Sequence, residues 1–161
     1  MNSFQSEISK VMEYLKNSSR RRSNCLKRKV GAAVVEIDPN GLGILGKLIS
    51  IGFNSSPVGL QPCKTCGRAG FNAGQNPYLC RVVHAEAKAI MDAYKSKKSR
   101  LVDCILITTL FPCAYCSDII IDSGVEGVYY GEDYYGTKET ETIIDKFGEA
   151  NIIIRKLDSV G

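Results

Sequence analysis

Histidine, tryptophan and long apolar segments are all scarce or missing in this sequence, and each scarcity excludes a class of protein or chemistry. His84 is the only histidine among the 161 residues, so any imidazole ligand or base must be this residue. No apolar run approaches the roughly 20 residues that a membrane-spanning helix needs, and the polar start lacks the features of a signal peptide. We therefore expect a cytoplasmic protein without a membrane partner.

The remaining composition is that of one ordinary globular domain, which we expect to span residues 1–161. Hydrophobic residues make up 44% of the chain and charged residues 24%, so a real core can form. The net charge is only +4, but much of the positive charge is concentrated in one stretch, at Arg20, Arg21, Arg22, Lys27, Arg28 and Lys29. Such a stretch favours contact with phosphate, although a solvated loop or a nuclear import signal would have the same composition.

The order of apolar patterns predicts an α/β fold. Apolar residues at helical spacing predict a first helix over residues 4–16, and continuous apolar runs predict strands that alternate with helices in the second half. The alternation is typical of a three-layer α/β/α sandwich whose later strands are parallel. We expect strands at 31–37, 44–53, 104–110, 125–130 and 152–156, and further helices at 83–94, 113–123 and 137–147.

Cysteines provide the first indication of chemistry, because in a cytosolic chain closely spaced cysteines bind metal more often than they form disulfides. Cys113 and Cys116 form a C-x-x-C pair that opens a predicted helix directly after Pro112. The positive end of a helix favours ionised thiols there. Together with His84 they make a ligand set suited to zinc that leaves a fourth position open for water, as in catalytic zinc sites.

Glu86 lies two residues after His84, at the start of the same predicted helix. A carboxylate beside a zinc-activated water can take its proton and return it elsewhere. An acid in the first turn of a helix could also simply interact with the helix dipole. Because three candidate zinc ligands accompany Glu86, the catalytic interpretation is favoured.

These motifs resemble a known family. The segments His84-Ala85-Glu86 and Pro112-Cys113-Ala114-Tyr115-Cys116 match the established H-x-E…P-C-x-x-C signature of zinc deaminases. The stretch 105–130, Val30-Gly31-Ala32 and the loop at 52–59 resemble deoxycytidylate (dCMP) deaminases in particular, over about residues 5–156. The resemblance implies a cytidine deaminase-like fold with a central mixed five-stranded sheet.

The resemblance also implies substrate contacts. Asn54 matches a loop asparagine that binds the sugar, Ala85 lies within the zinc motif, and Tyr135 matches an aromatic position near the nucleotide. Asn54 is equally a good turn residue, and Tyr135 could serve surface packing. For the 5′-phosphate, the candidates are Arg22, Lys29 and Arg81, among which the sequence does not choose.

Phe53 and Ser55 depart from the tyrosine and glycine usual in this loop. Because Ser55 has a Cβ, it adopts positive φ less freely than glycine. The family loop is tied to nucleotide binding and regulation, so this departure bears on regulation more than on catalysis.

The resemblance further implies a second, structural zinc, which some dCMP deaminases, particularly those of phages, hold. Its ligands would be four cysteines in and before the long predicted loop at 54–80, namely Cys25, Cys63, Cys66 and Cys80. Such a closed site would organise a loop that lacks regular structure. The alternatives are four unrelated thiols, or three ligands and a stray. Cys104, within an apolar strand, is most simply a small buried hydrophobe.

The reaction implied is hydrolysis of dCMP to dUMP and ammonia, which supplies dUMP for thymidylate synthesis. Family properties add dCTP as activator, dTTP as inhibitor, Mg²⁺ with the nucleotide effector, and a homo-oligomer such as a hexamer. No nucleic-acid partner is expected. The competing functions are deamination of tRNA adenosine, of free cytidine or of guanine. A zinc-stabilised nucleic-acid-binding module without catalysis would be a different class, and would leave Glu86 without a role.

Overall fold

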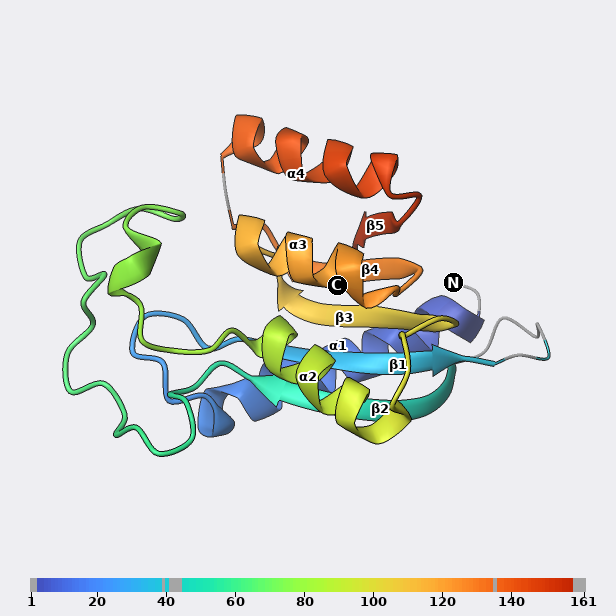
Figure 1. The fold of residues 1–161 in the computed structure, drawn as a ribbon, viewed down its shortest axis with the longest axis horizontal. Coiled ribbons are helices and arrows are strands. Elements are labelled where there is room, and N and C mark those ends of the chain that lie inside the picture. Colours follow the sequence, from blue (N-terminus) through green and yellow to red (C-terminus); the bar gives the residue numbers. More distant parts are fainter. Residues whose placement is uncertain (1–2, 39, 41–44, 135, 158–161) are drawn as a thin grey trace.

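The computed structural model describes residues 3–38, 40, 45–134 and 136–157. Five strands form one sheet in the order β2-β1-β3-β4-β5 (Figure 1). The pairs β2–β1 and β1–β3 are antiparallel, whereas β3–β4 and β4–β5 are parallel. The elements are α1 (Ser3–Arg22), β1 (Gly31–Ile37), β2 (Leu45–Phe53), a 3₁₀ turn (Pro77–Leu79), α2 (Ala85–Lys97), β3 (Cys104–Leu110), α3 (Ala114–Ser123), β4 (Gly127–Glu132), α4 (Thr137–Glu149) and β5 (Ile153–Lys156).

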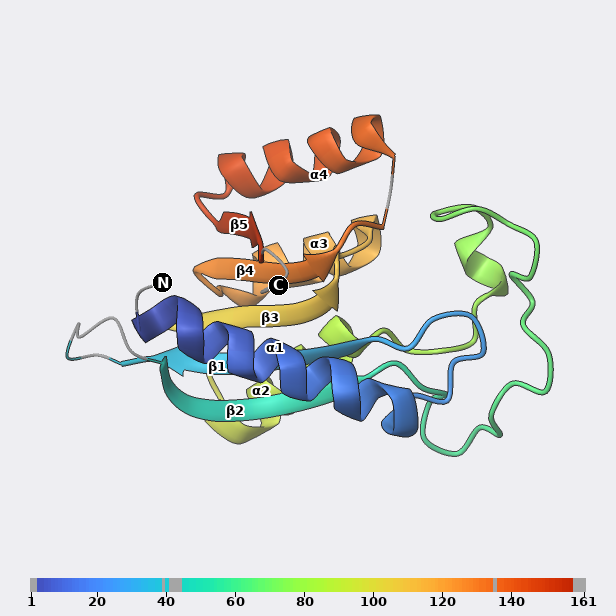
Figure 2. The ribbon, with the colours of Figure 1, turned by 180° about the vertical axis from the view of Figure 1, so that it is seen from behind.

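Helix α1 covers one face of the sheet by itself (Figure 2). Its buried side chains Ile8, Met12 and Leu15 recur at helical spacing and pack on Ala33 of β1 and Ile107 of β3. The helix runs on to Arg22, six residues beyond the predicted end. The basic residues Arg20–Arg22 therefore form its last turn, where positive charge favours the helix dipole, and they are not part of a loop.

The opposite face of the sheet carries α2, α3 and α4 (Figure 1). Side chains alternate along each strand, so Ala32 and Val34 point to this layer while Ala33 and Val35 point to α1. Ile120 of α3 and Phe147 of α4 complete the same core cluster. The predicted three-layer α/β/α sandwich with a mixed five-stranded sheet is confirmed. Among the helices of the described ranges, none has the length and apolar character needed to cross a membrane.

Helix α2 lies unusually close to β2, and a glycine makes this possible. A Cβ on Gly52 would lie 2.2 Å from the carbonyl oxygen of Ala85 and 2.6 Å from the amide nitrogen of Ala89. The Ser50 hydroxyl also donates a hydrogen bond of 2.6 Å to the Ala89 carbonyl oxygen. These contacts fix the first turn of α2 against the end of β2.

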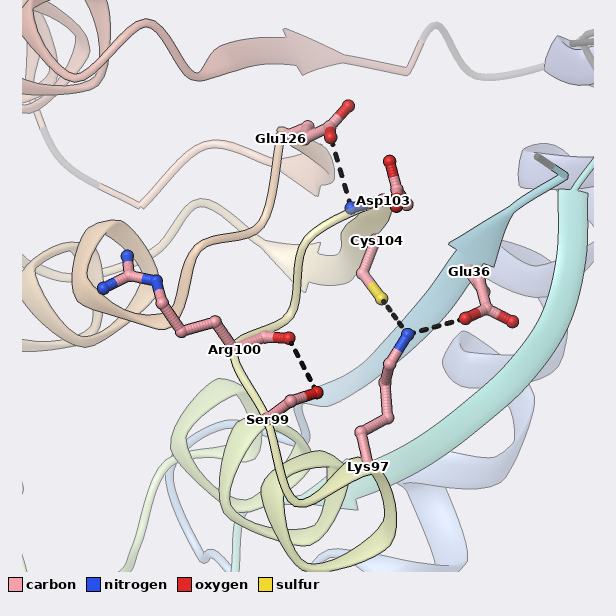
Figure 3. Close-up of polar contacts among 7 residues, drawn as sticks. All are labelled: Glu36, Lys97, Ser99, Arg100, Asp103, Cys104 and Glu126. Atoms are coloured by element: carbon pink, nitrogen blue, oxygen red, sulfur yellow. Dashed lines mark hydrogen bonds and ion pairs between the residues drawn. The ribbon is translucent and has the colours of Figure 1, made fainter.

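The other end of α2 is held by its last residue, Lys97 (Figure 3). The Lys97 ammonium donates to Glu36 Oε1 at 2.6 Å and lies 3.7 Å from the sulfur of Cys104. Glu36 belongs to β1 and Cys104 opens β3, so one side chain joins α2 to two strands. Cys104 is buried, as predicted, but its sulfur also accepts a hydrogen bond from the Lys97 ammonium.

Substitution of Gly52 by alanine should destabilise the protein, because the new methyl group would meet backbone atoms that cannot move without shifting α2. Overpacking of this kind typically costs about 1–3 kcal/mol. Gly148→Ala is the matched control, since a Cβ there meets nothing within 4 Å and alanine favours α4. Urea unfolding should show a lower midpoint for Gly52→Ala and an unchanged or higher one for Gly148→Ala. Equal stability of Gly52→Ala and the wild type would contradict the close approach.

Candidate active site

The candidate metal ligands lie where two helices begin. His84 is the N-cap of α2, and Cys113, after Pro112, is the N-cap of α3, both with extended backbone conformations. Cys116 follows one turn into α3, on the same side as Cys113. Both helices start at the same end of the sheet, from which the loop at 54–80 also extends (Figures 1 and 2). The site therefore faces the positive ends of two helix dipoles.

The ligand atoms of His84, Cys113 and Cys116 all lie within 4.8 Å of one another. His84 Nδ1 is 3.3 Å from the sulfur of Cys113 and 3.4 Å from that of Cys116. Tetrahedral zinc with ordinary Zn–S and Zn–N bonds sets such ligands roughly 3.5 Å apart. The three residues thus fit a zinc ion in donor type and in spacing. Within the described ranges, no other group of three or more potential ligands satisfies this criterion.

The protonation states of His84, Cys113 and Cys116 depend on one another. A hydrogen bond from Cys116, opposed by burial and aided by His84, lowers the pKa of Cys113 to about 4. The same contact raises the pKa of Cys116 well above its usual range, and Cys113 raises the pKa of His84 to about 10. A bound divalent cation would displace the protons held by His84 and Cys116, because metal ligands bind in their deprotonated forms.

Glu86 points into the same cluster. Its side chain is 4% exposed, and the Cys116 thiol lies 3.7 Å from Oε2. Burial raises the pKa of Glu86 to about 7, an effect that the neighbouring His84 partly opposes. A carboxyl group with a pKa near neutrality can accept a proton and release it again, as a general acid–base catalyst must. Glu86 also lies in the first turn of α2, where a carboxylate favours the helix dipole, so its catalytic role stays a prediction.

A cavity of about 70 Å³ opens beside this cluster. Ala85, Glu86, His84 and Cys113 form one wall. Apolar side chains form much of the rest, at Val30, Val82, Leu110 and Phe111. Mostly apolar walls with a few converging polar groups are typical of a small-molecule site.

Asn54 lines the cavity but is also tied into the protein. It is 5% exposed, and its Oδ1 accepts hydrogen bonds from the Ser23 hydroxyl at 2.5 Å and from the Val30 amide at 2.8 Å. Its Nδ2 donates to the carbonyl oxygen of Arg28 at 2.8 Å. The side chain therefore joins the end of β2 to the segment between α1 and β1, and one amide hydrogen is left over for a ligand. The predicted sugar contact stays a prediction.

The structure places the predicted phosphate-binding cations away from the cavity wall. Arg22 lies over the ring of Phe53, 4.9 Å from its centroid, and Lys29 donates a 2.8 Å hydrogen bond to the carbonyl oxygen of Ser23. Neither residue, nor Arg81, lines the cavity, which instead has three other cations, at Lys27, Arg28 and Arg68. Tyr135 lies outside the described residues, and its neighbour Tyr134 does line the cavity.

Sequence reasoning missed Arg68, which organises the loop at 54–80. Its side chain is 7% exposed, with Nε donating to the Gln75 carbonyl oxygen at 2.9 Å and a further bond to that of Asn72 at 3.3 Å. Burial opposes the raised pKa of Arg68, but the hydrogen bond with Tyr134 and nearby thiols outweigh it. A buried arginine in an aperiodic loop leaves no pattern in a sequence, so no signal could have found it.

The four cysteines of the predicted second site are all free and partly buried. Cys25, Cys66 and Cys80 line the cavity, whereas Cys63 does not. Their sulfurs do not form a group within 4.8 Å of one another, unlike the ligands around His84. The geometry thus brings three of the four to one cavity without closing a tetrahedral site.

Ser55 accommodates its departure from the family pattern without strain. It pairs with Val83 in an isolated antiparallel bridge, and its φ is not positive. Its hydroxyl also contacts the ammonium of Lys88. The loop conformation at this position therefore does not require glycine.

Comparison with known proteins points in the same direction as the geometry. The model of the cytidine and deoxycytidylate deaminase zinc-binding region matches residues 5–132. The deoxycytidylate deaminase of Mycobacterium phage D29 is 34% identical over 120 residues, which cover 70% of this chain and 85% of the phage protein. The deoxycytidylate deaminase of Saccharomyces cerevisiae is 28% identical over 129 residues, or 79% of this chain, and the match spans only 38% of the yeast protein.

A solved structure extends the similarity to the fold. The crystal structure of dCMP deaminase from the cyanophage S-TIM5, in complex with dCMP and dUMP, superposes with a TM-score of 0.70 at 29% identity. The match covers 93% of this chain and 96% of the phage chain. With the matched region reaching from α1 through both zinc motifs to β4, the chain belongs to the family of cytidine and deoxycytidylate deaminases that share this zinc-binding region.

Proposed function

We propose that the protein hydrolyses dCMP to dUMP and ammonia. The observation that carries the proposal is the buried Glu86 carboxyl beside three zinc-type ligands, on the wall of an apolar cavity. Three protein ligands leave one coordination position for water, which is the arrangement of catalytic zinc. The dCMP and dUMP bound to the cyanophage structure support a deoxycytidine nucleotide as substrate.

His84, Cys113 and Cys116 would hold the zinc. When bound, zinc supplies a Lewis acid that makes water a nucleophile near neutral pH. Glu86 accepts the proton of the attacking water and passes it to ring N3, so that carbon 4 becomes more electrophilic. Attack of the water oxygen on carbon 4 leaves a hydroxyl there. Glu86 takes the proton of this hydroxyl and gives it to the amino group, so that the bond from carbon 4 to nitrogen breaks, a carbonyl forms and ammonia leaves. The same carboxyl acts first as base and then as acid, which suits a pKa of about 7.

The remaining cavity residues orient the substrate. Ala85 and Phe111 border the space beside Glu86. The second amide hydrogen of Asn54 Nδ2 can donate a hydrogen bond to a hydroxyl oxygen of the sugar. The apolar walls exclude bulk water from the reacting ring, which strengthens the electrostatic contacts made inside. Lys29, on the segment that Asn54 anchors, remains our predicted phosphate contact.

Replacement of Glu86 by glutamine should abolish most turnover while leaving zinc in place, because the amide cannot accept a proton from water and release it to the substrate. Ammonia release from dCMP should fall about 100- to 10,000-fold in kcat, the range that general acid–base catalysis contributes. Glu141→Gln, an exposed acid on α4, is the matched control. Zinc content, measured by atomic emission, should equal that of the wild type in both variants. A Glu86→Gln protein that keeps its kcat would show that another group moves the proton.

The substrate is tested by offering dCMP, CMP, deoxycytidine and an adenosine-bearing tRNA separately to the zinc-loaded protein. We expect ammonia from dCMP at a kcat/KM far above that of the other three. Each assay is repeated with dCTP and magnesium, and ammonia released from dCTP alone is subtracted, so that an enzyme that requires an activator is not scored as inactive. Absence of turnover of dCMP under both conditions would overturn the proposal.

We propose that Cys25, Cys63, Cys66 and Cys80 hold a second, structural zinc. Three of them line one cavity, and Cys63 is spaced from Cys66 as zinc ligands commonly are. Binding would draw the thiols together and add its free energy to folding. The loop they belong to supplies Arg68 and its neighbours to the cavity, so its order bears on substrate binding.

The purified protein should then contain two zinc ions per chain. Joint substitution of Cys63 and Cys66 by serine should leave one zinc and lower the midpoint of thermal unfolding. Cys104→Ser is the control for zinc content alone, because this thiol lies on β3 and takes no part in either ligand set. A wild-type content of one zinc per chain would refute the second site. Regulation by dCTP and dTTP, Mg²⁺ with the effector, and a homo-oligomer stay predictions of the resemblance.

A further inference from the structure

A second hollow, here called the basic hollow, lies at the C-terminal end of α1 and has a volume of about 390 Å³. Thr109 and Leu110 at the end of β3 form part of its lining, so it opens where the parallel strands end. Four cations and a single carboxylate line it, namely Lys16, Arg20, Arg28, Lys29 and Glu132. The formal charge of this lining is +3, three-quarters of the net charge of the whole chain.

Two of the four cations, Arg28 and Lys29, are anchored by contacts of their charged groups, and Lys16 lies against β4. The stem of Lys16 passes over β4, where a Cβ on Gly131 would lie 3.2 Å from Lys16 Cε. Lys29 donates to the carbonyl oxygen of Ser23, and the Arg28 guanidinium lies 5.0 Å from the centroid of the Tyr134 ring. Anchored cations lose less conformational entropy on binding a ligand than free surface side chains do.

The basic hollow adjoins the catalytic cavity. Arg28, Val30 and Leu110 line both. A molecule whose ring lies beside Glu86 can therefore extend past these three residues toward Lys16 and Arg20. The cavity is mostly apolar and the hollow is mostly cationic, as a nucleotide with an apolar ring and a phosphate tail would require.

The charge of the hollow exceeds what a single phosphate needs. A phosphomonoester carries about −1.5 to −2 at pH 7, and the C-terminus of α1 adds roughly −0.5. Against a lining of +3, one monoester leaves positive charge unmatched, whereas a chain of two or three phosphates matches or exceeds it. The volume of about 390 Å³ also exceeds that of the cavity beside Glu86.

We propose that the basic hollow binds the polyphosphate chain of a nucleoside 5′-di- or triphosphate whose base occupies the catalytic cavity. The inference rests on the proposed function, which it extends from dCMP to dCDP and dCTP as ligands and substrates of the same site. Lys16 and Arg20, here called the far cations because they line the hollow but not the catalytic cavity, contact the phosphates beyond the first. Arg28, which lines both spaces, and Lys29, which follows it in the chain, contact the first phosphate.

The test removes the two far cations together, as Lys16→Gln with Arg20→Gln. The matched control is Lys10→Gln with Lys138→Gln, which removes the same charge at exposed positions outside both spaces. KM and kcat are measured for deoxycytidine, dCMP, dCDP and dCTP, and dUMP is added as a competitor. We expect the far-cation variant to raise KM for dCDP and dCTP tenfold or more, KM for dCMP less than threefold, and KM for deoxycytidine not at all.

Three results would overturn the inference. The first is dCTP binding that dUMP does not displace, since the triphosphate would then lie outside the catalytic cavity. The second is an equal rise in KM for dCMP and dCTP, which would make Lys16 and Arg20 contacts of the first phosphate. The third is no change in either KM.

Calorimetry with inorganic tripolyphosphate separates this inference from the proposed function. The wild type and the control variant should bind tripolyphosphate, and the far-cation variant should bind it at least tenfold more weakly, whether or not dCMP is turned over. If deamination is absent but this difference is found, the hollow is still a polyphosphate site and only the proposed reaction fails. If tripolyphosphate binds all three proteins equally, the hollow is not its site.

Discussion

The meeting of two helix starts at one end of the sheet is the constraint on which the rest of the site depends. His84 and Cys113 are both N-cap residues, and their ligand atoms lie 3.3 Å apart only because α2 and α3 pack side by side. The close approach of α2 to Gly52 and the clamp of Lys97 on Glu36 and Cys104 fix α2 at both ends. A shift of α2 along its axis would move His84 and Glu86 together, away from both cysteines.

The site concentrates groups that are costly to bury. A carboxyl, an imidazole and two thiols share a space from which water is largely excluded, and the burial that raises the pKa of Glu86 also penalises the charged forms of its neighbours. Cys113 and His84 offset part of this cost by ionising together. A bound divalent cation would offset more, because it replaces a shared proton with two positive charges next to thiolates. Metal affinity and the acid–base behaviour of Glu86 therefore have one origin in the burial of the cluster.

The features predicted from the sequence are those that depend on local spacing. The two-residue step from His84 to Glu86 and the three-residue step from Cys113 to Cys116 are short-range patterns at predicted helix starts, and they matched a known signature. The structure brings the ligand atoms of His84, Cys113 and Cys116 within 4.8 Å of one another. The end of α1 was predicted six residues early, because the residues after Lys16 lack the apolar repeat although nothing there breaks a helix before Ser23. Contacts set by tertiary structure could not be found this way. Arg68 is buried by a loop that folds back on it, and Arg22 lies over the ring of Phe53 and does not line the cavity.

Asn54 shows how the two halves of the site are connected. Its side chain accepts hydrogen bonds from Ser23 and Val30 and donates to Arg28, so one amide fixes the course of the whole segment between α1 and β1. That segment supplies Lys27 and Arg28 to the cavity and Arg28 and Lys29 to the basic hollow, while Asn54 itself directly follows β2, which supports α2. Asn54 therefore helps to set the position of these three cations relative to α2, which carries Glu86. An asparagine at this point acts as a structural link as well as a candidate sugar contact, since its amide can satisfy three protein groups and still offer one hydrogen to a ligand.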